Sequence, residues 1–112
     1  MSKLDYPAIR KWISIRQVLE LLGYKPVIQR GPQWRGPCPV CSNGVGMTQE
    51  RCFSVHVSRN LFQCFRCGRS GNQLDLWIHI SGLSLRPATL DLCQRLRVEP
   101  ITLENPQPQN RH

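Results

Sequence analysis

Hydrophobic residues near the N-terminus recur at the spacing of an amphipathic helix. Four of them fall three or four positions apart and so line one helix face: Ile15, Val18, Leu19 and Leu22. Ser14 followed by Gln17 matches a capping box, and Gly23 suits the left-handed residue that ends a helix. The pattern predicts a helix over residues 15–22, preceded by a turn at residues 8–12 that packs on the same core.

In the middle of the chain the pattern changes to short strands and tight turns. A hairpin and a second strand pair are predicted at residues 27–30, 33–36, 53–57 and 61–65. Phe53, Val55 and Val57 alternate with polar neighbours, which is typical of a strand with one buried face. Residues 42–50 are predicted to be a loop.

Helical spacing returns after residue 72. Leu74, Trp77 and Ile78 predict a helix that stops at Gly82, and residues 68–72 form the loop before it. A last helix is expected to be capped by Ser84, with four residues turned inward: Leu85, Ala88, Leu92 and Leu96. The fold class is a small α+β domain over residues 1–98, an antiparallel β-sheet flanked by short α-helices. Residues 99–112 are expected to be a disordered polar tail.

Charge and apolar content narrow the class of partner. The 112 residues include 15 Lys+Arg against 7 Asp+Glu, a net charge of +8, which favours a polyanion and nucleic acid before membrane. Apolar stretches are too short to span a bilayer, and the first residues lack the apolar core of a secretion signal. A cytoplasmic location is expected.

Two Cys-x-x-Cys pairs, 22 residues apart, are the strongest chemical signal in the chain. They are Cys38 with Cys41 and Cys64 with Cys67. Zinc takes four soft ligands in a tetrahedron, and a two-residue gap lets one turn present two sulfurs. A redox role is the alternative, but redox pairs come singly in a βαβ pattern. The pairs predict one structural Zn²⁺ in a closed site, giving a zinc-ribbon-like sheet.

The order of motifs resembles a known family. The capped helix is followed by Trp34-Arg-Gly-Pro-Cys-Pro-Val-Cys, then Phe53-Ser-Val, then Leu61-Phe-Gln-Cys-Phe-Arg-Cys-Gly and finally Gly71-Asn-Gln-Leu-Asp-Leu-Trp. Over residues 14–97 this resembles the N-terminal zinc-binding domain of bacterial-type DNA primases, the CHCC-type zinc-finger family. The resemblance implies a zinc ribbon flanked by helices that contacts single-stranded template DNA and helps choose where a primer begins.

The chain departs from that family in two ways. Cys41 stands where the family usually has histidine, so four thiolates give the site a formal charge of −2, which nearby Arg35, Arg66 and Arg69 can offset. Primases also carry their polymerising chemistry in a separate domain with clustered carboxylates. The seven acidic residues here form no metal-binding motif, and there is no phosphate-binding loop of the Walker type. We therefore expect no enzymatic activity from this chain alone.

Basic and aromatic residues interleave in the predicted sheet and its turns. Seven Lys or Arg lie between residues 25 and 69, with Glu50 as the single acidic residue there. Single-strand binders combine such a basic track with aromatic faces on which bases stack. The candidate nucleic-acid-binding residues are Trp34, Arg35, Arg51, His56, Arg59 and Arg66. Burial of Trp34 in the core remains an equal alternative to its use as a stacking platform.

Three functions fit these patterns. The first is a zinc-dependent module that binds single-stranded DNA, working in replication, priming or a mobile element with a separate polymerase, helicase or transposition protein. The second is a protein–protein adaptor in which the zinc ribbon is purely structural. The third is a remnant of a primase without retained activity.

Overall fold

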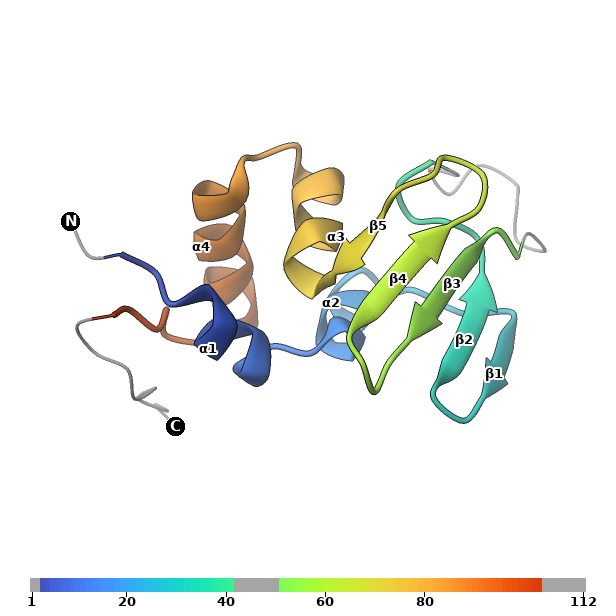
Figure 1. Ribbon diagram of the computed structural model, residues 1–112, viewed down its shortest axis with the longest axis horizontal. Helices are drawn as coiled ribbons and strands as arrows, with labels where there is room; N and C mark the ends of the chain where they lie inside the picture. The colour runs from blue at the N-terminus through green and yellow to red at the C-terminus, as the bar shows by residue number, and fades with distance from the viewer. Residues whose placement is uncertain (1–2, 42–50, 104–112) are drawn as a thin grey trace.

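The computed structural model describes residues 3–41 and 51–103 of the chain, and it arranges them as a five-stranded sheet next to four helices (Figure 1). In chain order the elements are α1 (Tyr6–Trp12), α2 (Ile15–Leu21), β1 (Ile28–Arg30), β2 (Gln33–Gly36), β3 (Phe53–His56), β4 (Leu61–Cys64), β5 (Ser70–Asn72), α3 (Gln73–Ser81) and α4 (Leu85–Leu96). The predicted small α+β class with an antiparallel sheet is confirmed. Within the described ranges, no helix is both long and apolar enough to cross a lipid bilayer.

The predicted capping signals of α2 are both used. The Ser14 side chain accepts a hydrogen bond from the Gln17 N–H, and the Gln17 side chain accepts one from the Ser14 N–H, which completes the capping box. At the other end Gly23 has φ +68°, its N–H reaches the carbonyl of Glu20, and the N–H of Tyr24 reaches that of Leu19. This pair of bonds is a Schellman motif, which delivers Tyr24 toward the sheet.

The five strands follow one another in chain order and every neighbouring pair is antiparallel. Side chains alternate between the two faces, so one face is buried and the other is open. The buried face carries Phe53 and Val55 of β3 and, directly opposite them, Cys64 and Phe62 of β4. We call this the inner face, and we call the opposite one, which carries Gln33, Arg35, Ser54, His56, Leu61 and Gln63, the outer face.

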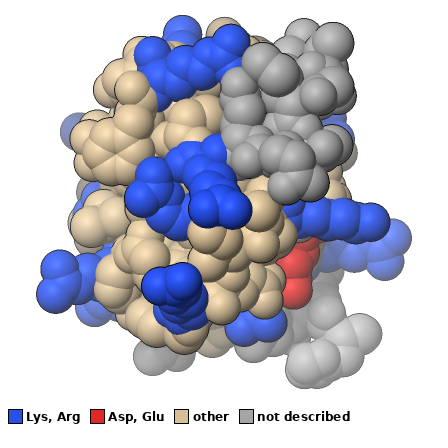
Figure 2. All heavy atoms as spheres, turned by 90° about the vertical axis from the view of Figure 1, so that its right-hand side faces the viewer, with Lys and Arg blue, Asp and Glu red and all other residues tan. Residues whose placement is uncertain are grey.

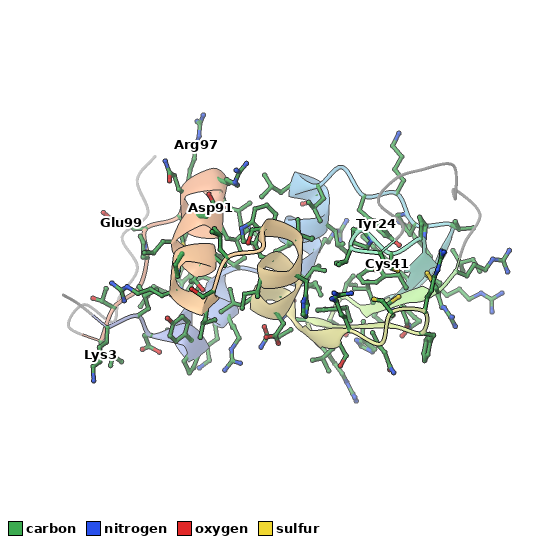
Figure 3. The ribbon with its side chains drawn as sticks, turned by 90° about the horizontal axis from the view of Figure 1, so that it is seen from above. Lys3, Tyr24, Cys41, Asp91, Arg97 and Glu99 are labelled. Carbon is green, nitrogen blue, oxygen red and sulfur yellow. The ribbon has the colours of Figure 1, made fainter. Side chains whose placement is uncertain are left out.

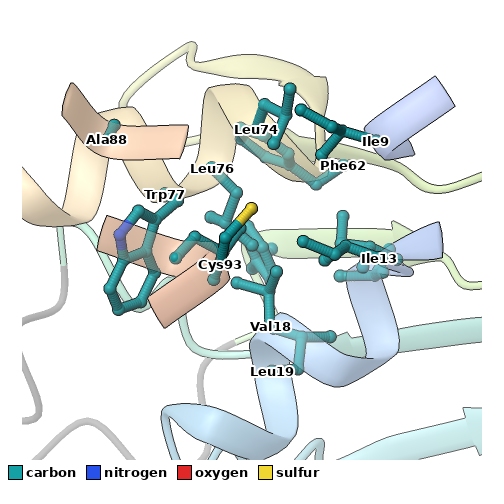
Figure 4. Close-up of a cluster of buried hydrophobic side chains, with 14 of the residues drawn as sticks. Ile9, Ile13, Val18, Leu19, Phe62, Leu74, Leu76, Trp77, Ala88 and Cys93 are labelled. Atoms are coloured by element: carbon teal, nitrogen blue, oxygen red, sulfur yellow. The ribbon is translucent and has the colours of Figure 1, made fainter. Parts of the chain in front are cut away.

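The inner face continues into a core shared with the helices. Val18 and Leu19 of α2, Leu74 and Leu76 of α3 and Leu92 of α4 are fully or almost fully buried there (Figure 4). Each such side chain contributes about 1.5–3 kcal/mol by leaving water. The helices therefore support the sheet from behind and leave its outer face uncovered.

One buried polar residue joins α1 to α3. Gln73 opens α3 and is 1% exposed, and its side-chain Nε2 donates to the carbonyl oxygens of Arg10 at 2.8 Å and Ile13 at 2.6 Å. These carbonyls end α1, so the amide satisfies groups that the helix itself leaves unpaired. The bonds fix α1 against the start of α3.

The helical predictions need three corrections. Residues 6–12 form a true helix, α1, with Asp5 as its N-cap, where a turn over 8–12 was expected. Ser84 does occupy the N-cap of α4, but its side chain makes no capping hydrogen bond, and Leu85 is 42% exposed instead of turned inward. Leu85 follows the cap directly, where the first turn of α4 has not yet reached the core.

Two corrections concern the sheet and the tail. Residues 70–72 form strand β5 against β4, where a loop was expected, because the chain leaving the second cysteine pair turns back along β4. Ile101 is 1% exposed and Leu4 bridges to Thr102, so the ordered domain continues past residue 98. The predicted loop 42–50 and the rest of the predicted tail, 104–112, lie outside the described residues.

Candidate metal centre

The structure brings all four predicted cysteine ligands together. The sulfur atoms of Cys38, Cys41, Cys64 and Cys67 lie within 4.8 Å of one another, although the two pairs come from opposite ends of the β2–β4 segment. Cys38 and Cys64 are buried, while Cys41 and Cys67 are half-buried. The cluster sits at the end of the sheet where β2 and β4 stop.

The first cysteine of each pair is oriented by the backbone of its own turn. The Sγ atom of Cys38 accepts hydrogen bonds from the N–H groups of Val40 at 3.3 Å and Cys41 at 3.4 Å. The Sγ atom of Cys64 accepts the matching pair from Arg66 and Cys67, both at 3.4 Å. Backbone donors aimed at sulfur favour the thiolate, which is the form that binds a metal.

The second turn is closed by a left-handed glycine. Gly68 has φ +79°, and its N–H donates to the carbonyl of Cys64 at 3.0 Å. The carbonyl of Arg69 then accepts from the N–H of Cys64, which starts the pairing of β5 with β4. The turn that carries Cys64 and Cys67 and the strand β5, which was not predicted, therefore both result from the same reversal of the chain.

The sulfur atoms perturb one another strongly. Burial raises the pKa of Cys38 to about 11, and burial followed by its neighbours Cys64 and Cys38 raises that of Cys41 far above its usual range. At Cys67 burial also acts upward, but hydrogen bonds from the backbone and side chain of Arg69 outweigh it and lower the pKa to about 6. Packed together without a cation, thiols cannot all ionise, and a bound cation removes that conflict.

The donor set fits one structural Zn²⁺. Zinc–thiolate bonds of about 2.3 Å in a tetrahedron place sulfurs about 3.8 Å apart, and Cys41 and Cys64 are 3.6 Å apart here. Four protein ligands fill the shell, so the site offers no position for water or substrate. Within the described ranges, no other group of three or more His, Cys, Asp or Glu side chains could hold a metal ion.

The predicted nucleic-acid-binding residues divide between the two sides of the sheet. Trp34 pairs with Val55 on the inner face, is half-buried, and has the Arg16 guanidinium 5.6 Å from its ring centre. Trp34 packs on the core. Its position therefore agrees with burial in the core, which was the alternative to its use as a stacking platform. Arg35 and His56 lie on the outer face, where His56 Nδ1 faces the Ser58 hydroxyl at 3.0 Å.

Arg35 is held in place beside the metal centre. Its Nη2 donates to the Arg51 carbonyl at 2.7 Å, and its guanidinium carbon lies 5.3 Å from the ring centre of Phe65. Phe65 is 61% exposed and stands inside the second cysteine pair. It was not among the predicted site residues, although the alternation that turns Phe62 and Cys64 inward also places Phe65 outward.

The outer face is hollowed between β3, β4 and β5. A shallow open groove of about 450 Å³ is lined by Gln33, Ser54, His56, Leu61, Gln63 and Ser70, among others. Arg51, Arg59 and Arg66 are exposed. Figure 2 shows the end of the molecule that carries the sheet, where Lys and Arg atoms far outweigh Asp and Glu atoms.

Comparison with known proteins agrees with this geometry. A profile of the CHC2 zinc finger family matches residues 2–107. The chain is similar to the DNA primase of Synechocystis sp., with 29% identity over 93 residues, 82% of this chain and 14% of that protein. The DNA primase of Synechococcus elongatus shows 27% identity over 93 residues, 82% of this chain and 13% of that protein.

A solved structure shows the same arrangement. The crystal structure of the Aquifex aeolicus primase, comprising zinc-binding and RNA polymerase domains, superposes with a TM-score of 0.62 at 27% identity. The match covers 85% of this chain and 22% of that one. The chain thus spans about one seventh of the curated relatives' length and under a quarter of the solved chain.

Proposed function

The chain belongs to the CHC2 zinc finger family, and we propose that it is a zinc-dependent module that binds single-stranded DNA across the outer face of its sheet. In this proposal it serves priming in DNA replication together with a separate catalytic protein. The observation that carries the proposal is the combination of a groove on the outer face, an exposed aromatic ring at Phe65 and exposed arginines in the segments next to β3 and β4.

The composition of this face suits an unpaired strand. Arg51, Arg59 and Arg66 are exposed, and such side chains can contact phosphates, which give affinity without sequence information. The groove on this face is lined by amide and hydroxyl side chains together with Leu61 and Phe62, and its uncharged polar groups can hydrogen-bond to base edges. Phe65 offers a flat apolar surface on which a base can stack.

The metal has a structural part in this role. A closed tetrathiolate site has no open position for chemistry, so its contribution is to hold the two cysteine turns, and with them Phe65 and Arg66, at fixed positions. Its binding energy becomes folding energy, on the order of 10 kcal/mol or more. DNA binding is accordingly expected to disappear when zinc is removed.

Catalysis is assigned to a separate protein. Polymerisation in primases needs clustered carboxylates that hold metal ions for phosphoryl transfer. The acidic residues in the described ranges, Asp5, Glu20, Asp75, Asp91 and Glu99, form no such cluster. We propose that this chain presents the template strand and does not itself form bonds.

Fluorescence anisotropy with labelled single- and double-stranded oligonucleotides tests the proposal. We expect preference for the single strand, loss of binding with a chelator, and a fall of log affinity with log salt at a slope near −3 if about four phosphates are contacted. Arg59→Glu should weaken binding strongly. Lys3→Glu is the matched control, because it makes the same charge change at the far end of the molecule (Figure 3).

The adaptor function remains the second candidate, because Leu61 is 47% and Phe65 is 61% exposed on the same face. Binding to oligonucleotides that is absent, or that does not change with salt or with Arg59→Glu, would remove the DNA proposal. An apolar docking face predicts instead a protein partner whose binding survives Arg59→Glu and is lost in Leu61→Ala.

A further inference from the structure

Phe65 carries an exposed ring on a backbone that is fixed on both sides. Its N–H donates to the carbonyl of Cys52 at 2.8 Å, and the sulfur of the preceding Cys64 accepts from two N–H groups of the same turn. The ring itself belongs to a residue that is 61% exposed. The backbone therefore determines where the ring stands, whereas the orientation of the ring depends on what the side chain touches.

The side chain of Arg35 touches this ring. Its guanidinium carbon lies 5.3 Å from the ring centre of Phe65, within the distance at which a cation is attracted to an aromatic face. Arg35 belongs to β2, where it pairs with Ser54 of β3, so the contact joins the outer face of the sheet to the second cysteine turn. The guanidinium covers part of the ring, and much of the rest is open to solvent.

The protein also fixes the guanidinium itself. Its Nη2 donates to the carbonyl oxygen of Arg51 at 2.7 Å, and its Nε is buried without a hydrogen-bond partner among the described residues. Nε and Nη2 form the same edge of the guanidinium, an edge that can grip a phosphate through two parallel hydrogen bonds. Because that edge is turned into the protein, Arg35 is less suited to a phosphate contact than the exposed Arg59.

Given the proposed binding of single-stranded DNA, on which this inference rests, we propose that Arg35 is a positioning residue that holds the Phe65 ring for stacking with an unpaired base. Guanidinium, phenyl ring and base then form three layers at the end of the sheet. DNA that meets a ring already held in place does not have to order it. The ordering of one side chain corresponds to about a two- to tenfold change in affinity.

A double-mutant cycle measured by fluorescence anisotropy tests this role. Arg35→Met keeps the aliphatic stem and removes the guanidinium, and we expect it to weaken binding of a single-stranded oligonucleotide about two- to tenfold. In the Phe65→Ala background the same substitution should change binding little, because the ring through which Arg35 acts is gone. The slope of log affinity against log salt should stay that of the parent, since no phosphate contact is lost.

Arg59→Met is the matched control, because it makes the same substitution at an exposed arginine. It should reduce the magnitude of the salt slope by about 0.7, the value for one phosphate contact on a single strand. Its effect on affinity should be the same with Phe65 present or replaced by alanine, because the two side chains act independently.

Two results would overturn the proposal if the parent protein binds the oligonucleotide. In one, Arg35→Met reduces the slope and its effect adds to that of Phe65→Ala, which identifies a direct phosphate contact. In the other, Arg35→Met binds as tightly as the parent. Zinc content and thermal melting show whether each variant is folded. If Arg35→Met is not, Arg35→Gln takes its place, since it keeps an N–H donor for the Arg51 carbonyl. A folded parent that binds no single strand would refute the DNA-binding function itself.

Discussion

The side-chain oxygen of Asn60 accepts a hydrogen bond from the backbone N–H of Ile15 at 2.8 Å, across 45 positions of sequence. Asn60 lies in the turn between β3 and β4 with φ +56°, and Ile15 is the first residue of α2. The bond satisfies one of the N–H groups that every helix start leaves unpaired; the Ser14 side chain satisfies another, that of Gln17. The central hairpin of the sheet is thereby pinned to the helix beneath it.

Replacing Asn60 should separate its two contributions. Asn60→Ala loses both the acceptor and the tolerance for left-handed backbone, so we expect unfolding free energy to fall by about 1–3 kcal/mol. Asn60→Gly keeps the backbone tolerance and should lose about 1 kcal/mol, while Asn60→Asp should lose least. Denaturant unfolding of the zinc-loaded proteins measures this. An Asn60→Ala protein as stable as the parent would contradict it.

Cys41 is the position where the ligand set can be exchanged. Because zinc accepts nitrogen and sulfur in the same tetrahedral geometry, Cys41→His should still bind one zinc ion per chain, while Cys41→Ala should bind it far more weakly. Metal analysis of the purified proteins checks the stoichiometry. In the cobalt form, the sulfur-to-metal band of Cys41→His should weaken as one thiolate is lost. Equal metal content in all three proteins would exclude Cys41 as a ligand.

Phe65 and Trp34 should respond differently to truncation. Phe65 is exposed, so Phe65→Ala should leave zinc content and stability nearly unchanged but weaken single-stranded DNA binding by about 1–3 kcal/mol per stacked base. Trp34 packs on the core, so Trp34→Ala should chiefly lower stability. Anisotropy and thermal melting of both variants separate the effects. Loss of DNA binding by Trp34→Ala at full stability would reverse the assignment.

Asp91 should give α4 a pH-dependent contribution. Its carboxylate accepts from Arg95 and from the Trp77 indole, both at 3.0 Å, and these bonds lower its pKa, that of Arg95 most. Because the folded pKa lies below the unfolded one, the stabilisation is complete above the ordinary value of 3.8 and is lost as pH falls through the folded pKa.

The test compares Asp91→Asn with the parent protein at several pH values. Asparagine keeps an acceptor for Trp77 and loses the charge. The melting temperature of the parent should therefore exceed that of Asp91→Asn at pH 7, and the difference should shrink toward pH 3. The difference between the two proteins is the measured quantity, because acid also releases zinc from both. A difference that is constant with pH would show that the charge of Asp91 contributes nothing.

Cys93 should be chemically inert in the folded protein. It is fully buried among core side chains (Figure 4), and burial raises its pKa to about 11. A thiol that is protonated and inaccessible reacts slowly with alkylating reagents. Its stabilising effect is complete below the ordinary pKa of 9 and falls as pH rises through about 11. Cys93→Ala should therefore destabilise the protein less at pH 10.5 than at pH 8, and rapid alkylation of native Cys93 would contradict this.

The parts of the fold that sequence could predict are those with local causes. The capping box of Ser14 and Gln17, the left-handed Gly23 and the alternation of Phe53 and Val55 all depend on neighbours within a few positions. The metal ligands were predictable for a similar reason, since a two-residue gap carries its geometry with it. The closure of the two pairs by the β2–β4 segment then follows.

The parts that sequence could not predict depend on distant partners. In the sequence Gln73 looks like an ordinary surface residue, because the carbonyl groups at the end of α1 that bind its side chain are 60 or more positions away. The sequence of strand β5 has no apolar alternation that could predict it. The strand forms because it pairs with β4. Ile101 looked like part of a polar tail, and its burial depends on the bridge between Leu4 and Thr102.

That bridge between Leu4 and Thr102 also has a practical consequence. It holds Lys3 and Leu103, the outermost residues that the structure describes, next to each other at the end of the molecule opposite the sheet (Figure 1). A sensor chip, a fluorophore or a neighbouring protein attached at Lys3 or Leu103 would therefore lie away from the sheet and its groove. A larger assembly could be joined to the domain at this end without covering the outer face of the sheet.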